Sequence, residues 1–112
     1  MSKIVVITGC SAGLGIAIAV QAAQKGHKVY ATMRNTSKRA ALDEAAAAAQ
    51  VALEVLPLDV ADTASVNICL EKIFTKEGRI DVLINNAGSG FVRSTEQASE
   101  EDIAWIMNVN FM

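Results

Sequence analysis

The chain has 112 residues, of which 52% are hydrophobic and 20% charged, and its formal net charge is −2. This length suffices for one compact domain and is too short for two, and the hydrophobic content excludes a disordered chain. Ten basic residues are set against twelve acidic ones, and no long basic run exists, so we expect neither nucleic-acid binding nor a polybasic membrane patch. These properties predict a small-molecule partner.

Neither the cysteines nor the apolar residues near the start of the chain indicate a targeting segment, a disulfide framework or a metal site. The longest apolar run near the start, residues 4–7, is too short for a signal-peptide core or a membrane span, so we expect a cytoplasmic protein. Cys10 and Cys69 have only His27 as a companion ligand, which indicates neither a disulfide framework nor a metal site. We expect both cysteines to be small buried residues and His27 to be an ordinary loop residue.

Apolar patterning predicts four strands that alternate with four helices. The predicted strands are runs rich in β-branched and other apolar residues, at 3–8, 28–33, 51–58 and 80–84. The predicted helices repeat apolar residues at helical spacing or are rich in alanine, at 14–24, 37–50, 63–78 and 100–112. Their end signals are Gly26 after the first helix, Thr36 or Ser37 before the second, Asp62 before the third, and Ser99 with Asp102 at the fourth.

This alternation predicts an α/β fold with a doubly wound parallel sheet. Parallel neighbours need helical crossovers, which are right-handed and cover both faces of the sheet. We expect four βα units in a Rossmann-like sheet with the strand order 3-2-1-4. In the third predicted strand, Pro57 should occupy a position that needs no backbone donor. Ligands of such sheets bind beyond the carboxyl ends of the strands, so the residues after each strand are the candidate site.

The first predicted strand runs into the glycine-rich turn Thr8-Gly9-Cys10-Ser11-Ala12-Gly13-Leu14-Gly15. Gly9 permits a tight turn, Gly13 lets the backbone approach a ligand, and Gly15 lets the next helix pack on the sheet. The helix N-terminus adds free N–H groups and a positive dipole end. The turn therefore predicts a pyrophosphate cradle that differs from the P-loop and from G-x-G-x-x-G. The alternative is a plain glycine turn between a strand and a helix.

With this turn the sequence resembles the short-chain dehydrogenase/reductase family, whose nucleotide loop reads T-G-x-x-x-G-x-G. Leu58-Asp59-Val60 looks like the family's adenine-contacting aspartate, and Asn85-Asn86-Ala87-Gly88 is similar to its N-N-A-G signature. Asn110 is at the place of the asparagine in the family's Asn-Ser-Tyr-Lys catalytic group. The strings 9–11 and 31–34 look most like the 17-beta-hydroxysteroid and retinol dehydrogenase branch. The resemblance covers essentially the whole chain.

The resemblance implies an NAD(P)-dependent oxidoreductase that transfers a hydride between nicotinamide and a carbonyl or alcohol. Residues 1–112 would form the N-terminal part of its single dinucleotide-binding domain. The implied cofactor-binding residues are Gly9, Ser11, Gly13, Leu14, Gly15, Arg34, Asp59, Val60, Asn86, Ala87 and Gly88, and the implied catalytic residue is Asn110. No metal ligand is expected.

Three of these side chains also have simpler interpretations. Asp59 can accept a hydrogen bond from the adenine amino group, or it can cap the next turn. Asn110 places an amide on an apolar helix stripe, where it can serve the active site or bond a helix carbonyl or water. Arg34 follows the second strand with no carboxylate before Asp43. It favours the 2′-phosphate of NADP over NAD, unless it is a solvated charge, and we expect NADP.

The family's Tyr-x-x-x-Lys pair has no counterpart in this sequence. The one tyrosine, Tyr30, has Arg34 four residues later, and strand spacing separates them by more than roughly 10 Å. We therefore expect Tyr30 in the core or on a sheet face. We expect the chain to be part of a larger, homo-oligomeric dehydrogenase with a small carbonyl or alcohol substrate, and to be inactive alone. A non-catalytic dinucleotide-binding module and an inactive remnant are the alternatives.

Overall fold

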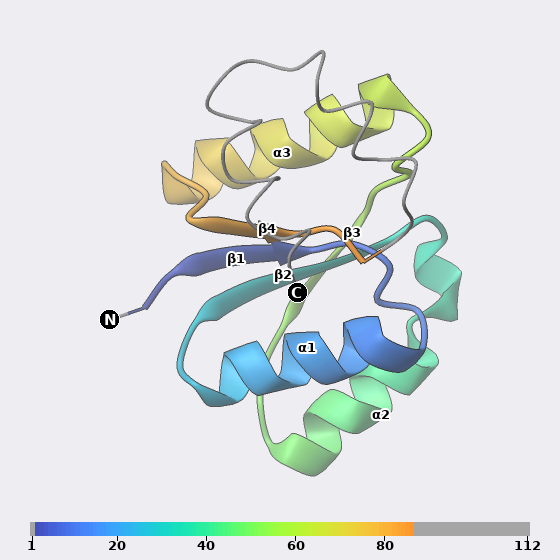
Figure 1. The fold of residues 1–112 in the computed structure, drawn as a ribbon, viewed down its shortest axis with the longest axis vertical. Coiled ribbons are helices and arrows are strands. Elements are labelled where there is room, and N and C mark those ends of the chain that lie inside the picture. Colours follow the sequence, from blue (N-terminus) through green and yellow to red (C-terminus); the bar gives the residue numbers. More distant parts are fainter. Residues whose placement is uncertain (1, 87–112) are drawn as a thin grey trace.

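Residues 2–86, which the computed structural model describes, form a parallel sheet between two helical layers (Figure 1). Their four strands lie in the order β3-β2-β1-β4 and are β1 Ile4–Ile7, β2 Lys28–Met33, β3 Glu54–Pro57 and β4 Val82–Ile84. Helices α1 (Gly13–Gln24) and α2 (Ala40–Ala49) cover one face, and α3 (Thr63–Glu77) covers the other. The predicted doubly wound sheet and its strand order are confirmed.

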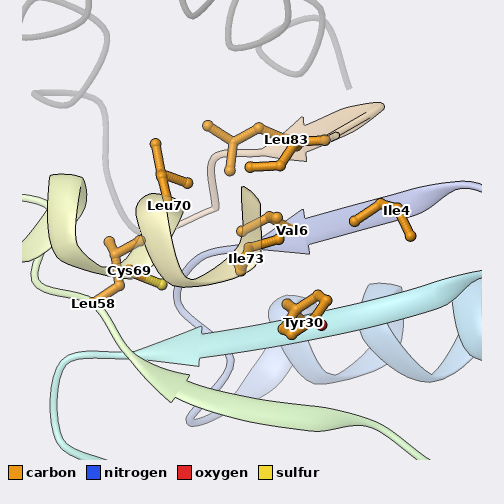
Figure 2. Close-up of a cluster of buried hydrophobic side chains, with 9 residues drawn as sticks. Ile4, Val6, Tyr30, Leu58, Cys69, Leu70, Ile73 and Leu83 are labelled. Atoms are coloured by element: carbon orange, nitrogen blue, oxygen red, sulfur yellow. The ribbon is translucent and has the colours of Figure 1, made fainter. Parts of the chain in front are cut away.

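Strand β1 occupies the middle of this sheet because it is apolar on both faces. Successive side chains of a strand point to opposite sides, so Val5 and Ile7 join the core beneath α1 and α2, while Ile4 and Val6 join the core beneath α3. Figure 2 shows the second core, in which Ile73 of α3 lies over β1. Burial on both faces explains why the strand reads as an uninterrupted β-branched run.

The segment between β2 and β3 departs from the prediction of one helix capped by Thr36 or Ser37. Instead, the Asn35 side chain accepts hydrogen bonds from the Ser37 backbone N (3.0 Å) and Ser37 Oγ (2.7 Å). This local bonding favours a short turn, the 3₁₀ helix η1 (Thr36–Lys38), and α2 begins only at Ala40. The cap is therefore Asn35, and the predicted helix is divided in two.

Strand β3 is shorter than the predicted run 51–58. Only the residues aligned with β2 form the ladder, from Tyr30 beside Glu54 to Met33 beside Pro57. Within the described residues β3 is an edge strand, so Pro57 needs no donor on its outer side, as predicted. The Met33 carbonyl accepts its hydrogen bond from Leu58 N at 2.9 Å.

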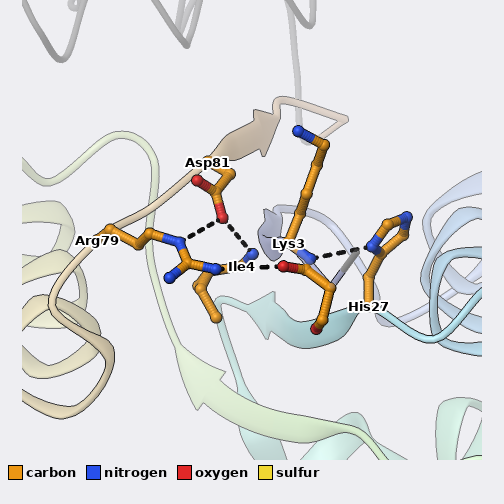
Figure 3. A network of polar contacts seen from close by, with 6 residues as sticks. Lys3, Ile4, His27, Arg79 and Asp81 are labelled. Atoms are coloured by element: carbon orange, nitrogen blue, oxygen red, sulfur yellow. Dashed lines mark hydrogen bonds and ion pairs between the residues drawn. The ribbon is translucent and has the colours of Figure 1, made fainter.

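The start of β1 is fastened at the end of the sheet away from the predicted site (Figure 3). Asp81 Oδ2 accepts hydrogen bonds from Ile4 N (2.7 Å) and Arg79 Nε (2.9 Å). The Ile4 N–H, and after it the Arg79 guanidinium, hold the pKa of Asp81 below its usual value. Lys3 N donates to His27 Nδ1 at 3.1 Å, so His27 is the loop residue that was expected.

Tyr30 and the two cysteines are core residues, as predicted. Tyr30 is 2% exposed and its hydroxyl donates to the Glu77 carboxylate, so burial and then this carboxylate raise the pKa of Tyr30. Cys10 and Cys69 are buried free thiols. Within residues 2–86 no helix has the length and apolar character to cross a membrane, and no cluster of His, Cys, Asp and Glu side chains could hold a metal ion.

Candidate functional site

The residues that follow the strands border one groove of about 480 Å³. Its lining brings together segments from four separate parts of the chain: Gly9, Ser11, Ala12, Met33, Arg34, Leu58, Asp59, Val60, Ala61 and Asn86. Six of the predicted site residues are among them, namely Gly9, Ser11, Arg34, Asp59, Val60 and Asn86. The groove therefore lies at the carboxyl edge of the sheet, where ligands of this fold bind.

Glycines shape the turn from β1 into α1. Gly9 and Gly13 have left-handed backbones, with φ of 70° and 58°, which favour glycine. A Cβ added to Gly13 would meet nothing within 4 Å, whereas one added to Gly15 would lie 2.2 Å from the Gly9 carbonyl oxygen. Gly13 therefore leaves an open side on the turn, and Gly15 allows α1 to pack closely against the glycine loop, which we define as residues 9–12.

The N-terminus of α1 has no capping side chain. Its N-cap residue, Ala12, supplies no hydrogen bond, and no acidic residue lies in the first turn. Helix α3 differs, because Asp62 there accepts hydrogen bonds from Ala64 N (3.0 Å) and Ser65 N (3.4 Å). The N–H groups and positive dipole end of α1 are thus left without an anionic partner among the described residues, which is the arrangement that binds an anion. Leu14, in the same turn, is 66% exposed.

Thr8 and Asn86 join the glycine loop to the end of β4. Asn86 N donates to Thr8 Oγ1 at 2.9 Å, and Thr8 Oγ1 donates to Asn85 Oδ1 at 3.1 Å. Asn86 Nδ2 donates to the Gly9 carbonyl at 3.1 Å. These hydrogen bonds tie the ends of β1 and β4 together. The linking role of Thr8 was not predicted, because the sequence shows only a threonine directly after a strand.

The end of β2 holds the loops on both of its sides. The Thr32 carbonyl accepts a hydrogen bond from Cys10 N (3.0 Å), and the Met33 carbonyl accepts one from Leu58 N (2.9 Å). The next residue, Arg34, is exposed and lines the groove. A guanidinium therefore stands between the glycine loop and the loop after β3, where it can pair with an anionic group.

Asp59 caps its own turn, because Asp59 Oδ1 accepts a hydrogen bond from Ala61 N at 3.0 Å. This confirms the simpler interpretation of Asp59, while its contact with adenine stays a prediction. The Asp59 backbone N donates to Ser65 Oγ at 2.9 Å, which attaches the loop to α3. The role of Ser65 was not predicted, because a serine in the first turn of a helix gives no sign of a partner six residues earlier.

Three predicted site residues, Ala87, Gly88 and Asn110, lie outside the described residues, as does the predicted helix 100–112. Their roles stay predictions. Among the residues that line the groove there is no tyrosine and no lysine. The described part of the site can therefore bind and orient a ligand, but it holds no proton donor of the tyrosine type.

A parallel sheet ordered 3-2-1-4, with a glycine turn and an open helix end after its first strand, defines a Rossmann-like nucleotide-binding fold. The family model described as short chain dehydrogenase matches residues 3–112. The chain belongs to this family.

Known relatives agree with this assignment and with the branch that the sequence suggested. Human 17-beta-hydroxysteroid dehydrogenase type 1 is 42% identical over 113 residues, which cover 96% of this chain and 34% of that protein. Human retinol dehydrogenase 8 is 41% identical over 113 residues, 97% of this chain and 35% of that protein. The crystal structure of a metagenomic short-chain oxidoreductase in complex with NADP has a TM-score of 0.70 and 32% identity, over 78% of this chain and 39% of that one. The chain spans about a third of the length of the curated relatives it matches.

Proposed function

We propose that the groove binds NADP and that the chain supplies the cofactor-binding part of a short-chain oxidoreductase. When bound, the cofactor would supply the redox chemistry: NADPH would donate a hydride to a small carbonyl, and NADP⁺ would accept one from the corresponding alcohol. One observation carries the proposal: a single groove gathers six predicted contact residues beside a helix N-terminus that no side chain caps. The family assignment and the NADP complex of a solved neighbour support it.

The glycine loop and α1 fit the diphosphate of this cofactor. Ser11 lines the groove, and the backbone at Gly13 is open to an approaching group. The loop N–H groups, the Ser11 hydroxyl and the positive end of α1 would bind the negative oxygens. Gly15 contributes indirectly, because it lets α1 begin directly beneath the loop.

The other sides of the groove, formed by Arg34 and by the loop after β3, fit the adenosine half of the cofactor. Arg34 would pair with the 2′-phosphate through its planar guanidinium, which would make NADP the preferred cofactor over NAD. Asp59 and Val60 would contact adenine, and the turn around Asp59 is fixed by the Ala61 and Ser65 hydrogen bonds. Asn86 to Gly88 would lie on the nicotinamide side, and Asn110 would support the catalytic group of the complete homo-oligomeric enzyme.

Titration calorimetry of the purified chain with NADPH and NADH tests the proposal. We expect NADPH to bind at least about tenfold more tightly, because a charge-assisted bidentate contact contributes roughly this factor or more. Arg34→Ala should abolish the difference while leaving the affinity for NADH unchanged. Lys38→Ala removes a nearby exposed cation outside the groove and should leave both affinities unchanged. Equal affinity of the wild-type chain for the two cofactors would refute the NADP assignment, and absence of binding to both would refute the site.

A further inference from the structure

A buried set of hydrogen bonds joins the glycine loop to β2. Thr32 Oγ1 donates to the Ile7 carbonyl at 2.9 Å, and Cys10 Sγ donates to the same oxygen at 3.4 Å. Cys10 N donates in turn to the Thr32 carbonyl at 3.0 Å. Cys10 and Thr32 are both 0% exposed. We call this set, formed by Ile7, Cys10 and Thr32, the loop bridge.

The thiol of Cys10 also reaches the first turn of α1. Cys10 Sγ lies 3.7 Å from the Gly15 carbonyl oxygen, and a thiol has one proton, so its donation is divided between two carbonyls. Burial raises the pKa of the Cys10 thiol to about 12. The thiol therefore keeps its proton at neutral pH and acts as a weak donor rather than as a nucleophile.

Packing alone does not explain why position 32 has a threonine rather than a valine. The neighbours of Thr32 in β2, Ala31 and Met33, are buried apolar residues, and a valine at position 32 would have nearly the same shape. Burying a hydroxyl costs free energy unless it makes a hydrogen bond. Here the hydroxyl makes its bond to Ile7, the last residue of β1, where the glycine loop begins.

The loop bridge lies between two groups that line the groove. Thr32 is two residues before Arg34, and Cys10 directly precedes Ser11. Short backbone segments thus connect the buried hydrogen bonds to both groups, so the bridge limits how far Ser11 and Arg34 can move apart. Holding contact groups at a fixed spacing before binding lowers the entropy that binding costs.

We propose that Thr32 and Cys10 are positioning residues that set the spacing between Ser11 and Arg34 and thereby the preference for NADPH over NADH. This inference rests on the proposed function. NADPH would engage both groups through two phosphate sites, whereas NADH has no 2′-phosphate for Arg34. Loss of the bridge should therefore weaken NADPH binding more than NADH binding.

The test is calorimetric titration of Thr32→Val with both cofactors. The variant keeps the shape of the side chain and removes the donor to Ile7. We expect the Kd for NADPH to rise about fivefold, the factor that one buried hydrogen bond typically supplies, while the Kd for NADH changes less than about twofold. Thr32→Ser keeps the hydroxyl and should retain the wild-type preference. Cys10→Ala, a second variant on the other side of the bridge, should change the preference in the same direction.

A control variant distinguishes a loss of positioning, which changes the ratio of the two Kd values, from a loss of stability, which changes Tm alone. Ile73→Val removes a methyl group from a fully buried side chain in the core beneath α3, so it should lower Tm and leave the ratio of the two Kd values unchanged. A wild-type Kd ratio in Thr32→Val and Cys10→Ala, whether or not their Tm is lowered, would overturn the inference and leave the proposed function intact. A wild-type chain that binds neither cofactor would instead overturn the proposed function, and this inference with it.

Discussion

Replacement of Gly15 by alanine should damage both the stability of the fold and the groove. A Cβ at this position would lie 2.2 Å from the Gly9 carbonyl oxygen, 2.9 Å from the Gly9 carbonyl carbon and 2.8 Å from Asn86 Nδ2. Two of these atoms belong to the backbone, which cannot rotate away as a flexible side chain can. Either α1 or the glycine loop must move, and the hydrogen bond from Asn86 to the Gly9 carbonyl would be strained or lost.

The size of the effect follows from three terms, of which two destabilise the fold and one stabilises it. Overpacking in a rigid site costs about 1–3 kcal/mol, and the lost Asn86 hydrogen bond adds about 1 kcal/mol. Alanine gains about 1 kcal/mol over glycine through helix propensity. The net loss is about 1–3 kcal/mol, which corresponds to a fall in Tm of roughly 5–15 °C for a domain of this size. Because the glycine loop must shift, the affinity for NADPH should fall at least about tenfold.

Calorimetric melting and NADPH titration measure these two effects. Gly26→Ala is the control for replacing a glycine without a steric clash, because a Cβ there would meet nothing within 4 Å, although Gly26, unlike Gly15, has a left-handed backbone (φ 90°). The control should cost about 1–2 kcal/mol of backbone strain and leave NADPH affinity unchanged. A Gly15→Ala chain that melts within about 2 °C of wild type and binds NADPH with the wild-type affinity would refute the steric argument.

Three further predictions concern other contacts. Ser65→Ala removes the acceptor for Asp59 N and should weaken NADPH binding about threefold by calorimetry; unchanged affinity would contradict a role of this hydrogen bond in shaping the groove. Asp81→Asn should lower Tm by roughly 4 °C at pH 7. Since the folded pKa of Asp81 lies below 3.8, its stabilisation is present above that pH and lost as the pH falls through the folded value, so the two melting curves should converge in acid. Burial raises the pKa of Cys10 to about 12 and that of Cys69 to about 11, so a thiol reagent at pH 8 should label neither cysteine in the native chain and both in urea.

Features that depend on neighbouring residues could be predicted from the sequence. Asp62 caps α3 and Gly78 ends it with a left-handed backbone, because a cap and a stop signal act within one turn. The roles of Gly9 and Gly15 followed from their spacing after an apolar strand. The strand order was predicted from the Rossmann-like alternation of strands and helices, and the run that is apolar at every position, β1, lies inside the sheet as such a run should.

Features that depend on residues far apart in the sequence could not be predicted. The limits of β3 depend on where β2 ends beside it. A threonine inside a strand is typical of any sheet, so nothing near Thr32 indicated a bond to Ile7, 25 positions away.

The position of the groove follows from the way the chain leaves neighbouring strands. After β1 the chain turns to the face covered by α1 and α2, whereas after β3 it turns to the face covered by α3 (Figure 1). The two loops therefore diverge, with the end of β2 between them, and the carbonyls of Thr32 and Met33 hold one loop each. Arg34, the next residue, extends from this fixed point and makes no hydrogen bond or ion pair with either loop among residues 2–86. Exchange of Arg34 should thus change cofactor preference alone, whereas changes at Thr32 should alter both preference and Tm.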